Sequence, residues 1–272
     1  MSLPPFCPRF PLLLEFLLNK ALIAAVAALG IAAAGCSSSD AGSPATPSGG
    51  SSASTPAPST PTAAATSASA SSPVATPPGK AALAKIVLQQ ADLPAGWTAS
   101  QHESDPSDAA AQAAFLRCAG GRDTQPDRAA KVDSPDFDLD DASVMSSASS
   151  FKTQSAVEAD VAVLKSAKAS ACYQQVGKAE IARSLPSGAT LDKLSFKITP
   201  APASAPANVV AIGRGTVTVT VSGERVVLYL AVAFIAGRLV EAEVDIESPG
   251  QPIPDDMLMS LAGAVAARAP QA

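Results

Sequence analysis

A run of apolar and β-branched residues near the end of the chain constrains its fold more than any other feature. The stretch GTVTVTVSGERVVLYLAVAFIAGRLVEAEVDIE, residues 215–247, has the pattern of three strands joined by tight turns at Ser222-Gly223-Glu224 and Ala236-Gly237-Arg238. The middle strand, VVLYLAVAFI, is apolar at consecutive positions, so both of its faces should be covered. The sequence therefore predicts an antiparallel meander within a sheet that has another layer on each side.

Periodic patterns elsewhere complete an α+β domain over residues 80–272. We expect strands after Trp97 and at 142–151, and the residues between Gly120 and Asp141 have the composition of a polar loop. The expected fold is an antiparallel sheet of about five strands with a C-terminal meander, covered by helices in a sandwich-like arrangement. Helices are expected at 81–93, at 105–118 with Ser107 as the N-cap, from Thr153 to at least Ala171 with a restart or continuation to Leu185, and at 254–268, with a further strand at 190–199.

The segment before this domain has the pattern of an export signal. Lys20 precedes ALIAAVAALGIAAAG, an apolar run that ends in small residues directly before Cys36. Ala34, Gly35 and Cys36 resemble the lipobox of bacterial lipoproteins, which implies that residues 1–35 are a signal peptide and that Cys36 becomes the lipidated first residue. The alternative is an uncleaved anchor formed by residues 10–35. Both place the domain at the outer face of the cell membrane.

The composition of the next segment predicts a tether, and the charge of the chain limits the kinds of molecule that it can bind. Residues 36–79 comprise the lipid site, Cys36, and a segment of almost only Ser, Ala, Thr, Pro and Gly, which cannot form a core and is expected to be a disordered tether. Without the first 36 residues the chain has 17 basic and 23 acidic residues, because Arg9, Glu15 and Lys20 are removed from totals of 19 and 24. This negative balance argues against a nucleic-acid partner.

Motifs for catalysis are few. His102 is the single histidine and lies in a polar stretch, so any Ser-His-Asp or Cys-His site would depend on it. The motif Gly213-Arg214-Gly215 precedes a strand rather than a helix, which indicates a bulge or the start of a strand and not a phosphate loop. We therefore expect no enzyme activity and no cofactor.

Two groups of carboxylates are candidate cation sites. The aspartates at 133, 136, 138, 140 and 141 crowd one segment, but they lack the glycine and closing glutamate of a calcium loop. Glu241, Glu243, Asp245 and Glu247 alternate with apolar residues, as on a solvated face of a strand at the edge of a sheet, and a cation or basic-ligand site is the alternative.

Two cysteines remain in the exported domain once Cys7 is removed with the signal and Cys36 is acylated. An even pair in an oxidising compartment favours a disulfide between Cys118 and Cys172. Each lies near the C-terminal end of an expected helix, so the bond would hold the two helices together. The alternatives are two buried thiols or a zinc site, for which a second pair of ligands is missing.

Several segments together resemble a family of actinobacterial secreted lipoproteins and sensor-type domains. They are DLPAGWT, FLRC, SPDF, ASACYQQV and LPSGAT, followed by the terminal meander and helix, over residues 80–268. The order of elements is more distantly similar to the extracellular sensor domains of mycobacterial receptor kinases and to LpqN-type lipoproteins with a PsbP-like sandwich. The resemblance implies an envelope location and a sandwich fold, and it carries no catalytic residues.

Three functions follow from these observations. The first is a non-catalytic ligand-binding or sensing domain on a lipid anchor, with the membrane as one partner and a small molecule or lipid as another. The second is an envelope-lipid carrier with a deep dry cavity lined by residues such as Leu228, Leu230, Val232 and Phe234. The third is a hydrolase in which His102, an aspartate and a serine converge on one cleft.

Overall fold

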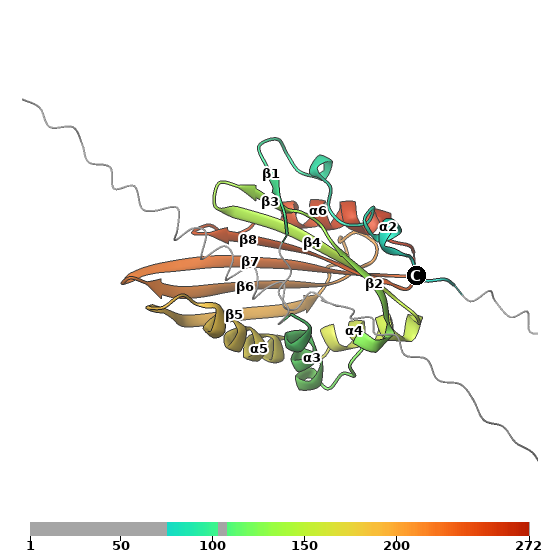
Figure 1. Ribbon diagram of the computed structural model, residues 1–272, viewed down its shortest axis with the longest axis horizontal. Helices are drawn as coiled ribbons and strands as arrows, with labels where there is room; N and C mark the ends of the chain where they lie inside the picture. Colours follow the sequence, from blue (N-terminus) through green and yellow to red (C-terminus); the bar gives the residue numbers. More distant parts are fainter. Residues whose placement is uncertain (1–74, 103–107, 272) are drawn as a thin grey trace, which may run out of the picture. The chain divides into compact units, whose positions relative to one another are not determined.

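The computed structural model describes residues 75–102 and 108–271. The expected signal peptide, Cys36, the tether up to residue 74 and Ser107 lie outside these ranges. The described residues between Lys80 and the C-terminus form an α+β domain built on one antiparallel sheet of eight strands (Figure 1).

The C-terminal meander is present as the sequence predicts. Strand β6 (Val209–Val221), β7 (Glu224–Gly237) and β8 (Val240–Pro249) pair in succession, and β5 (Ala189–Pro200) pairs with β6. Ser222 and Gly223 join β6 to β7 with φ values of 52° and 85°, the left-handed conformation that a two-residue hairpin turn requires. The second turn is formed by Arg238 and Leu239 rather than by residues 236–238, because Ala236 and Gly237 are the last residues of β7.

The sheet is larger than the five strands expected. Strand β4 (Ala142–Phe151) pairs with β8, and β3 (Asp136–Leu139), β1 (Thr98–Ser100) and β2 (Arg128–Asp133) follow on its other side. The path is β1-β3-β4-β8-β7-β6-β5, with β2 also paired to β4. Residues 120–141 are therefore not simply a loop. Their short polar segments form strands because β4 offers them a strand to pair with.

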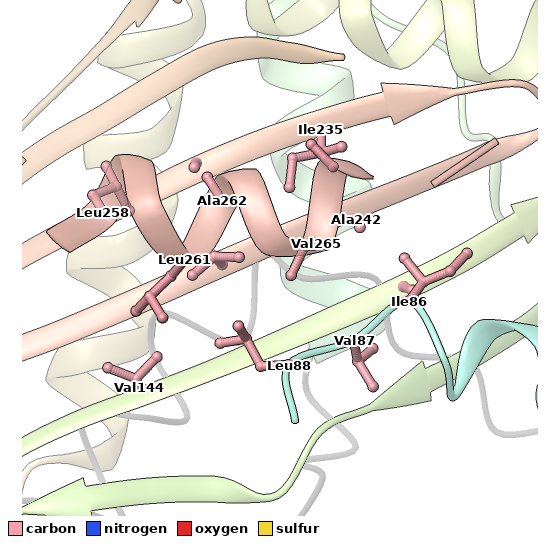
Figure 2. Packing of buried hydrophobic residues seen from close by; sticks show 14 of the residues in the cluster. Ile86, Val87, Leu88, Val144, Ile235, Ala242, Leu258, Leu261, Ala262 and Val265 are labelled. Carbon is pink, nitrogen blue, oxygen red and sulfur yellow. The ribbon is translucent and has the colours of Figure 1, made fainter. Parts of the chain in front are cut away.

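One face of the sheet is covered by the C-terminal helix and by the first residues of the domain. Helix α6 (Asp255–Arg268) buries Leu258, Leu261 and Val265, the stripe that the sequence predicts, against β4, β7 and β8 (Figure 2). The expected helix at 81–93 is only one turn, α2 (Lys80–Leu83), followed by the 3-10 turn η1 (Gln90–Asp92). Between them Ile86, Val87 and Leu88 are buried in the same core, which outweighs their helical pattern.

Three helices cover the opposite face of the sheet. They are α3 (Asp108–Ala119), α4 (Gln154–Leu164) and α5 (Ala169–Ser184), with the 3-10 turn η2 (Gln125–Asp127) leading into β2. The long helix expected from Thr153 is divided after Leu164 and restarts at Ala169. Strand β7 is thus buried on both faces, with Ala231, Ala233 and Ile235 towards α6 and Leu228, Leu230 and Val232 towards the other three helices.

Candidate functional site

The four acidic side chains of β8 are buried, so their assignment to a solvated edge is wrong. Glu241, Glu243, Asp245 and Glu247 are only 9, 5, 3 and 5% exposed. Strand β8 lies between β7 and β4, and β4 takes the position that would otherwise leave an edge. Because three helices cover this face, the four acids, here named the acidic row, lie inside the domain rather than in water.

The acidic row divides one face of the sheet into a polar and an apolar part. On the β4 side, Glu241, Glu243 and Glu247 pair with Ser149, Ser147 and Ser143, and Asp245 pairs with Met145. On the β7 side the partners of the row are Ala236, Phe234, Val232 and Leu230. The row therefore stands where the hydrophobic core under α3 and α5 ends and a serine-lined region begins.

Glu241 has a second buried carboxyl beside it. Asp160 of α4 is 7% exposed, and its Oδ2 accepts a hydrogen bond of 2.8 Å from Thr124 Oγ1. Burial, the nearby Asp160 charge and a hydrogen bond with Asp160 raise the pKa of Glu241 well above its ordinary value. Burial also raises the pKa of Asp160, to about 6, although its hydrogen bonds and nearby Arg128 act in the opposite direction. The two buried carboxyls are thus hydrogen-bonded to each other, and Asp160 makes loss of the Glu241 proton harder.

Arg128 supplies the positive charge closest to this pair. Its side chain is 8% exposed, its Nη2 donates to Gln112 Oε1 over 3.1 Å, and its guanidinium carbon lies 5.9 Å from the centre of the Phe151 ring. Burial lowers the pKa of Arg128 to about 10, against the attraction of Glu241 and Asp160. The guanidinium remains charged at neutral pH and balances one carboxylate of the group.

Tyr173 of α5 reaches the row across an aromatic stack. Its ring lies on that of Phe196 with centroids 3.9 Å apart and an angle of 11° between the planes. Phe196 in turn lies on the backbone of β6, because a Cβ at Gly213 or Gly215 would overlap its ring. Gly213-Arg214-Gly215 is therefore neither a bulge nor the start of a strand, since it lies within β6 and makes room for Phe196.

The Tyr173 hydroxyl ends among acidic groups. Burial raises its pKa well above 10, and Asp245, Glu243 and Glu247 act in the same direction. Within the described ranges, the hydroxyl oxygen has no hydrogen-bond partner although the residue is only 3% exposed. A buried hydroxyl without a partner is rare in folded proteins and points to a missing ligand or water.

A cavity of about 50 Å³ lies between the three helices and the sheet. We call it the helix-side cavity. Besides Tyr173, the hydrogen-bonded carboxyls of Glu241 and Asp160 line it. Its lining residues are Gln112, Phe115, Leu116, Asp160, Leu164, Tyr173, Phe234, Glu241 and Glu243. The cavity thus combines an aromatic and aliphatic wall with several polar groups, as small-molecule sites do.

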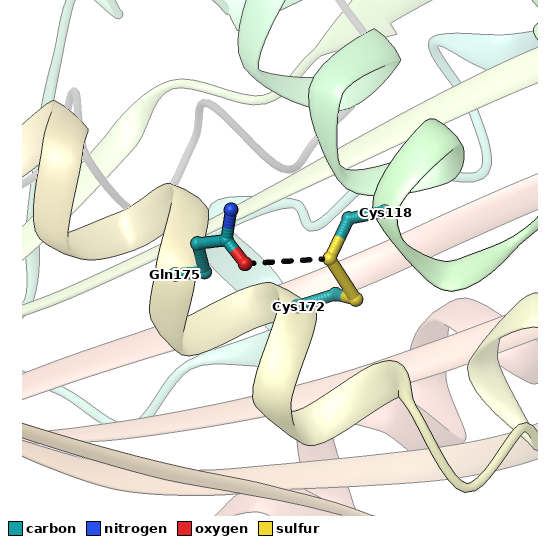
Figure 3. The surroundings of a disulfide bond; sticks show 3 residues. All are labelled: Cys118, Cys172 and Gln175. Atoms are coloured by element: carbon teal, nitrogen blue, oxygen red, sulfur yellow. Dashed lines mark hydrogen bonds between the residues drawn. A yellow bond between two sulfur atoms is a disulfide. The ribbon is translucent and has the colours of Figure 1, made fainter.

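The disulfide holds two walls of this cavity together. Cys118 of α3 and Cys172 of α5 are bonded, with Cα atoms 5.6 Å apart, which is the pairing that the sequence favours (Figure 3). Gln175 lies beside the bond with Oε1 3.7 Å from Cys118 Sγ, a packing contact because a disulfide sulfur has no hydrogen to donate. Tyr173 directly follows Cys172, so the bond limits how far its ring can move from α3.

The single histidine of the sequence lies beside Asp136, whose charge acts on Glu247 at the other end of the acidic row. His102 Nδ1 lies 2.8 Å from Asp136 Oδ1, and both side chains are largely buried. Burial lowers the pKa of His102, but the hydrogen bond and charge of Asp136 outweigh it, so the net direction is upward. The nearby Ser100 hydroxyl donates to Asp138 instead, over 3.1 Å. In the part of the chain that the structure describes, a histidine and an aspartate meet without a serine bonded to the imidazole.

The aspartates weighed as a cation site lie along β2, β3 and the turn to β4. Asp133 ends β2 and pairs with Lys131 at 2.8 Å, Asp136 and Asp138 lie in β3, and Asp140 and Asp141 form the turn to β4. Over residues 75–102 and 108–271, no three His, Cys, Asp or Glu side chains are grouped as ligands for a metal ion. Of the residues proposed for a lipid cavity, Phe234 lines the helix-side cavity, and Leu228, Leu230 and Val232 pack in the core.

The chain matches no protein-family model and no curated protein sequence. Among the helices of the described residues, none has the length and apolar character needed to cross a membrane.

Proposed function

We propose that this protein is a lipoprotein of the cell envelope, anchored through Cys36, whose folded domain binds or senses a small molecule without transforming it. The position of Cys36 between an apolar segment and a Ser/Ala/Thr/Pro-rich tether supports the location. The helix-side cavity supports binding, because Tyr173, which lines it, has a buried hydroxyl with no hydrogen-bond partner among the described residues.

That last observation carries the proposal. An unpartnered buried polar atom costs about 1–3 kcal/mol, which is a noticeable part of a domain's stability. A bound ligand that pairs with the Tyr173 hydroxyl removes this cost.

The test of binding uses the full chain purified from its own host in detergent. Native mass spectrometry should find a retained small molecule, and Leu164→Trp, which fills the cavity from α4, should remove it. Leu191→Trp is the matched control, because Leu191 packs against the same core but does not line the cavity. A wild-type protein that carries no ligand, and whose melting temperature no small-molecule library raises, would contradict the proposal.

The anchor has a separate test. Cys36→Ala should move the protein from the detergent phase to the aqueous phase, while the wild type should begin at Cys36 and carry the mass of its acyl chains. An unchanged partition, or a wild-type chain that retains residues 1–35, would show that Cys36 is not the anchor.

A hydrolase is the second candidate, because His102 and Asp136 are arranged like the general base of a catalytic triad and the carboxylate that orients it. Esterase, peptidase and glycosidase substrates should show no turnover if the protein only binds. A turnover that His102→Ala abolishes, and that Leu164→Trp leaves in place, would replace the binding proposal with this one.

A further inference from the structure

We infer that one end of the domain binds the anionic surface of a lipid bilayer, and so orients the domain on the membrane to which Cys36 anchors it. The inference rests on the proposed location and adds a partner surface to it. The surface, here named the basic end, consists of four exposed cations, Lys80, Lys85, Lys152 and Arg238. Its basis is the place of these cations relative to the tether and to the acids of the domain.

Two of the cations meet where β4 ends beside the turn between β7 and β8. The backbone N–H of Phe151 donates to the carbonyl oxygen of Leu239 over 2.9 Å. Lys152 directly follows Phe151 and Arg238 directly precedes Leu239, so the two basic residues are neighbours across this hydrogen bond.

The C-terminal residues connect this turn to α2, which carries the other two cations. The backbone N–H of Arg238 donates to the carbonyl oxygen of Pro270 over 2.9 Å. Arg268, two residues earlier, donates from Nε to the carbonyl oxygen of Ile86 over 3.3 Å, directly after Lys85. Helix α2 and the C-terminus lie at the same end of the domain (Figure 1). Segments from four parts of the chain thus form the basic end.

The cations at this end outnumber the acids that could neutralise them. In the part of the chain that the structure describes, none of the four basic side chains is in an ion pair. The acids Asp92 and Asp127 are each already bound by an arginine. Asp123, in the loop before η2, and Glu158, in α4, are exposed. Four free cations against these two acids leave the end with a net positive charge.

An acidic surface lies at the opposite end of β4. Asp140 and Asp141 are exposed directly before this strand, and Lys152 follows its last residue. The strand has 10 residues, so roughly 33 Å separates the two charged ends. That distance exceeds the Debye length at physiological salt, about 8 Å. An anionic bilayer therefore attracts the basic end and repels the acidic one.

The position of the tether identifies the bilayer as the partner of this surface. The residues that lead from Cys36 enter the domain at Lys80, so the anchor is linked to the basic end and not to the acidic one. Each Lys or Arg held close to an anionic bilayer strengthens binding about fivefold. A few such contacts are enough for a domain that is already tethered to the bilayer, because its effective concentration there is high.

Lysine reactivity in vesicles tests the inference on the mature, acylated protein. The protein is reconstituted in vesicles of phosphatidylcholine, alone or mixed with an equal amount of phosphatidylglycerol, and labelled with a membrane-impermeant amine reagent. In the anionic vesicles Lys80, Lys85 and Lys152 should react about threefold to tenfold more slowly, and about 0.5 M salt should remove the difference. Lys178 and Lys193 are internal controls, because they line a groove beside the distal part of β5 and should react equally in both vesicles.

Two matched variants separate the basic end from overall charge. Lys85→Gln/Lys152→Gln/Arg238→Gln should abolish the protection of Lys80 in anionic vesicles. Lys178→Gln/Lys193→Gln/Arg225→Gln removes the same charge from exposed positions elsewhere and should leave that protection within twofold of the wild type. All six positions are exposed, so neither variant disturbs the core.

The outcomes distinguish this inference from the proposed anchor. Equal reactivity of the basic-end lysines in the two kinds of vesicle, in protein that carries its acyl chains, would overturn the inference and leave the anchor. Protection of Lys178 and Lys193 to the same extent would show adsorption without orientation, which also overturns it. A chain without acyl chains would overturn the anchor alone if added anionic vesicles still protect the basic end, and both proposals if they do not.

Discussion

Arg268 in the last turn of α6 binds Asp92 with two parallel hydrogen bonds, of 3.0 Å to Oδ1 and 2.8 Å to Oδ2. The same guanidinium donates to the carbonyl oxygens of Ile86 and Val87. The sequence predicts Arg268 only as a cation that suits the end of a helix. In the folded domain it instead joins the first residues of the domain to the last helix.

Loss of this contact should destabilise the domain. Arg268→Met should lower the free energy of unfolding by about 1–3 kcal/mol, because it removes two charged hydrogen bonds to Asp92 and the bonds to the carbonyl oxygens of Ile86 and Val87. Urea unfolding followed by circular dichroism measures the change. Arg238→Met is the control, since Arg238 is exposed in the turn before β8 and should change stability by less than about 0.5 kcal/mol. Equal effects of the two variants would contradict the assignment.

The disulfide should contribute a large part of the stability. Cys118 and Cys172 are 54 residues apart, and closing such a loop is worth about 4 kcal/mol by chain entropy. The double variant Cys118→Ser/Cys172→Ser should lose about that amount. It should also retain less of any ligand bound in the helix-side cavity, because α3 and α5 both contribute to the lining of that cavity. Reduction of the wild type should reproduce both effects, and a reduced protein that unfolds like the oxidised one would refute the prediction.

Stability should fall as pH rises from about 4 to 8. Burial raises the pKa of Asp160 from 3.8 to about 6 and that of Glu247 from 4.5 to about 8. Over this window the unfolded chain loses protons that the folded chain keeps, so ionisation favours unfolding. For Asp160 the loss is on the order of 2–3 kcal/mol and is complete above its folded pKa.

The urea concentrations at the midpoint of unfolding, compared at pH 5 and pH 8, measure this loss of stability. Asp160→Asn and Glu247→Gln should each flatten the profile, because neither variant has a carboxyl to ionise. Below pH 4 the trend reverses: burial opposes ionisation of Asp92, but its bonds to Arg268 and Gln89 outweigh that and lower its pKa, so acid removes its contribution. A profile that rises steadily to pH 8 would contradict the burial of these acids.

The edge of the sheet formed by β5 should resist pairing with a strand of another molecule. Strand β5 pairs on one side only, has an irregularity between Leu191 and Lys193, and exposes Lys193 and Lys197. Lys193→Val/Lys197→Val should produce concentration-dependent oligomers in analytical ultracentrifugation. Lys165→Val/Lys178→Val removes the same charge from exposed positions outside the strands and should stay in the wild-type state. Oligomers of both variants would point to charge rather than the strand edge.

Much of the fold follows from periodicity, and the polar site does not. The meander, the stripe of α6 and the cysteine pair are visible because their patterns are long or paired. Strands β2 and β3 were not predicted, since short polar segments become strands only when β4 is beside them. The acidic row looks solvated because its alternation is the same whether water or a helix faces it.

One sequence feature does point to the buried row. Strand β7 is apolar on both faces, which requires a layer on each side, and β8 is its neighbour in the same sheet. The acids of β8 therefore had to lie under that layer unless β8 was an edge. What periodicity cannot supply is the pairing of β4 with β8, which joins distant parts of the chain through serines that carry no hydrophobic signal.

Gly213 and Gly215, the two glycines under the Phe196 ring, also restrict which substitutions this sequence can accept. Alanine at 213 is acceptable only where residue 196 is already small, while a small residue at 196 in the present background leaves a void under Tyr173. A side chain at 215 would also overlap the backbone of Ser195, so that position should remain glycine whatever residue 196 is. Among descendants of this sequence, residues 196 and 213 should therefore change together or not at all, and the order in which the two substitutions arise decides whether the first is harmful.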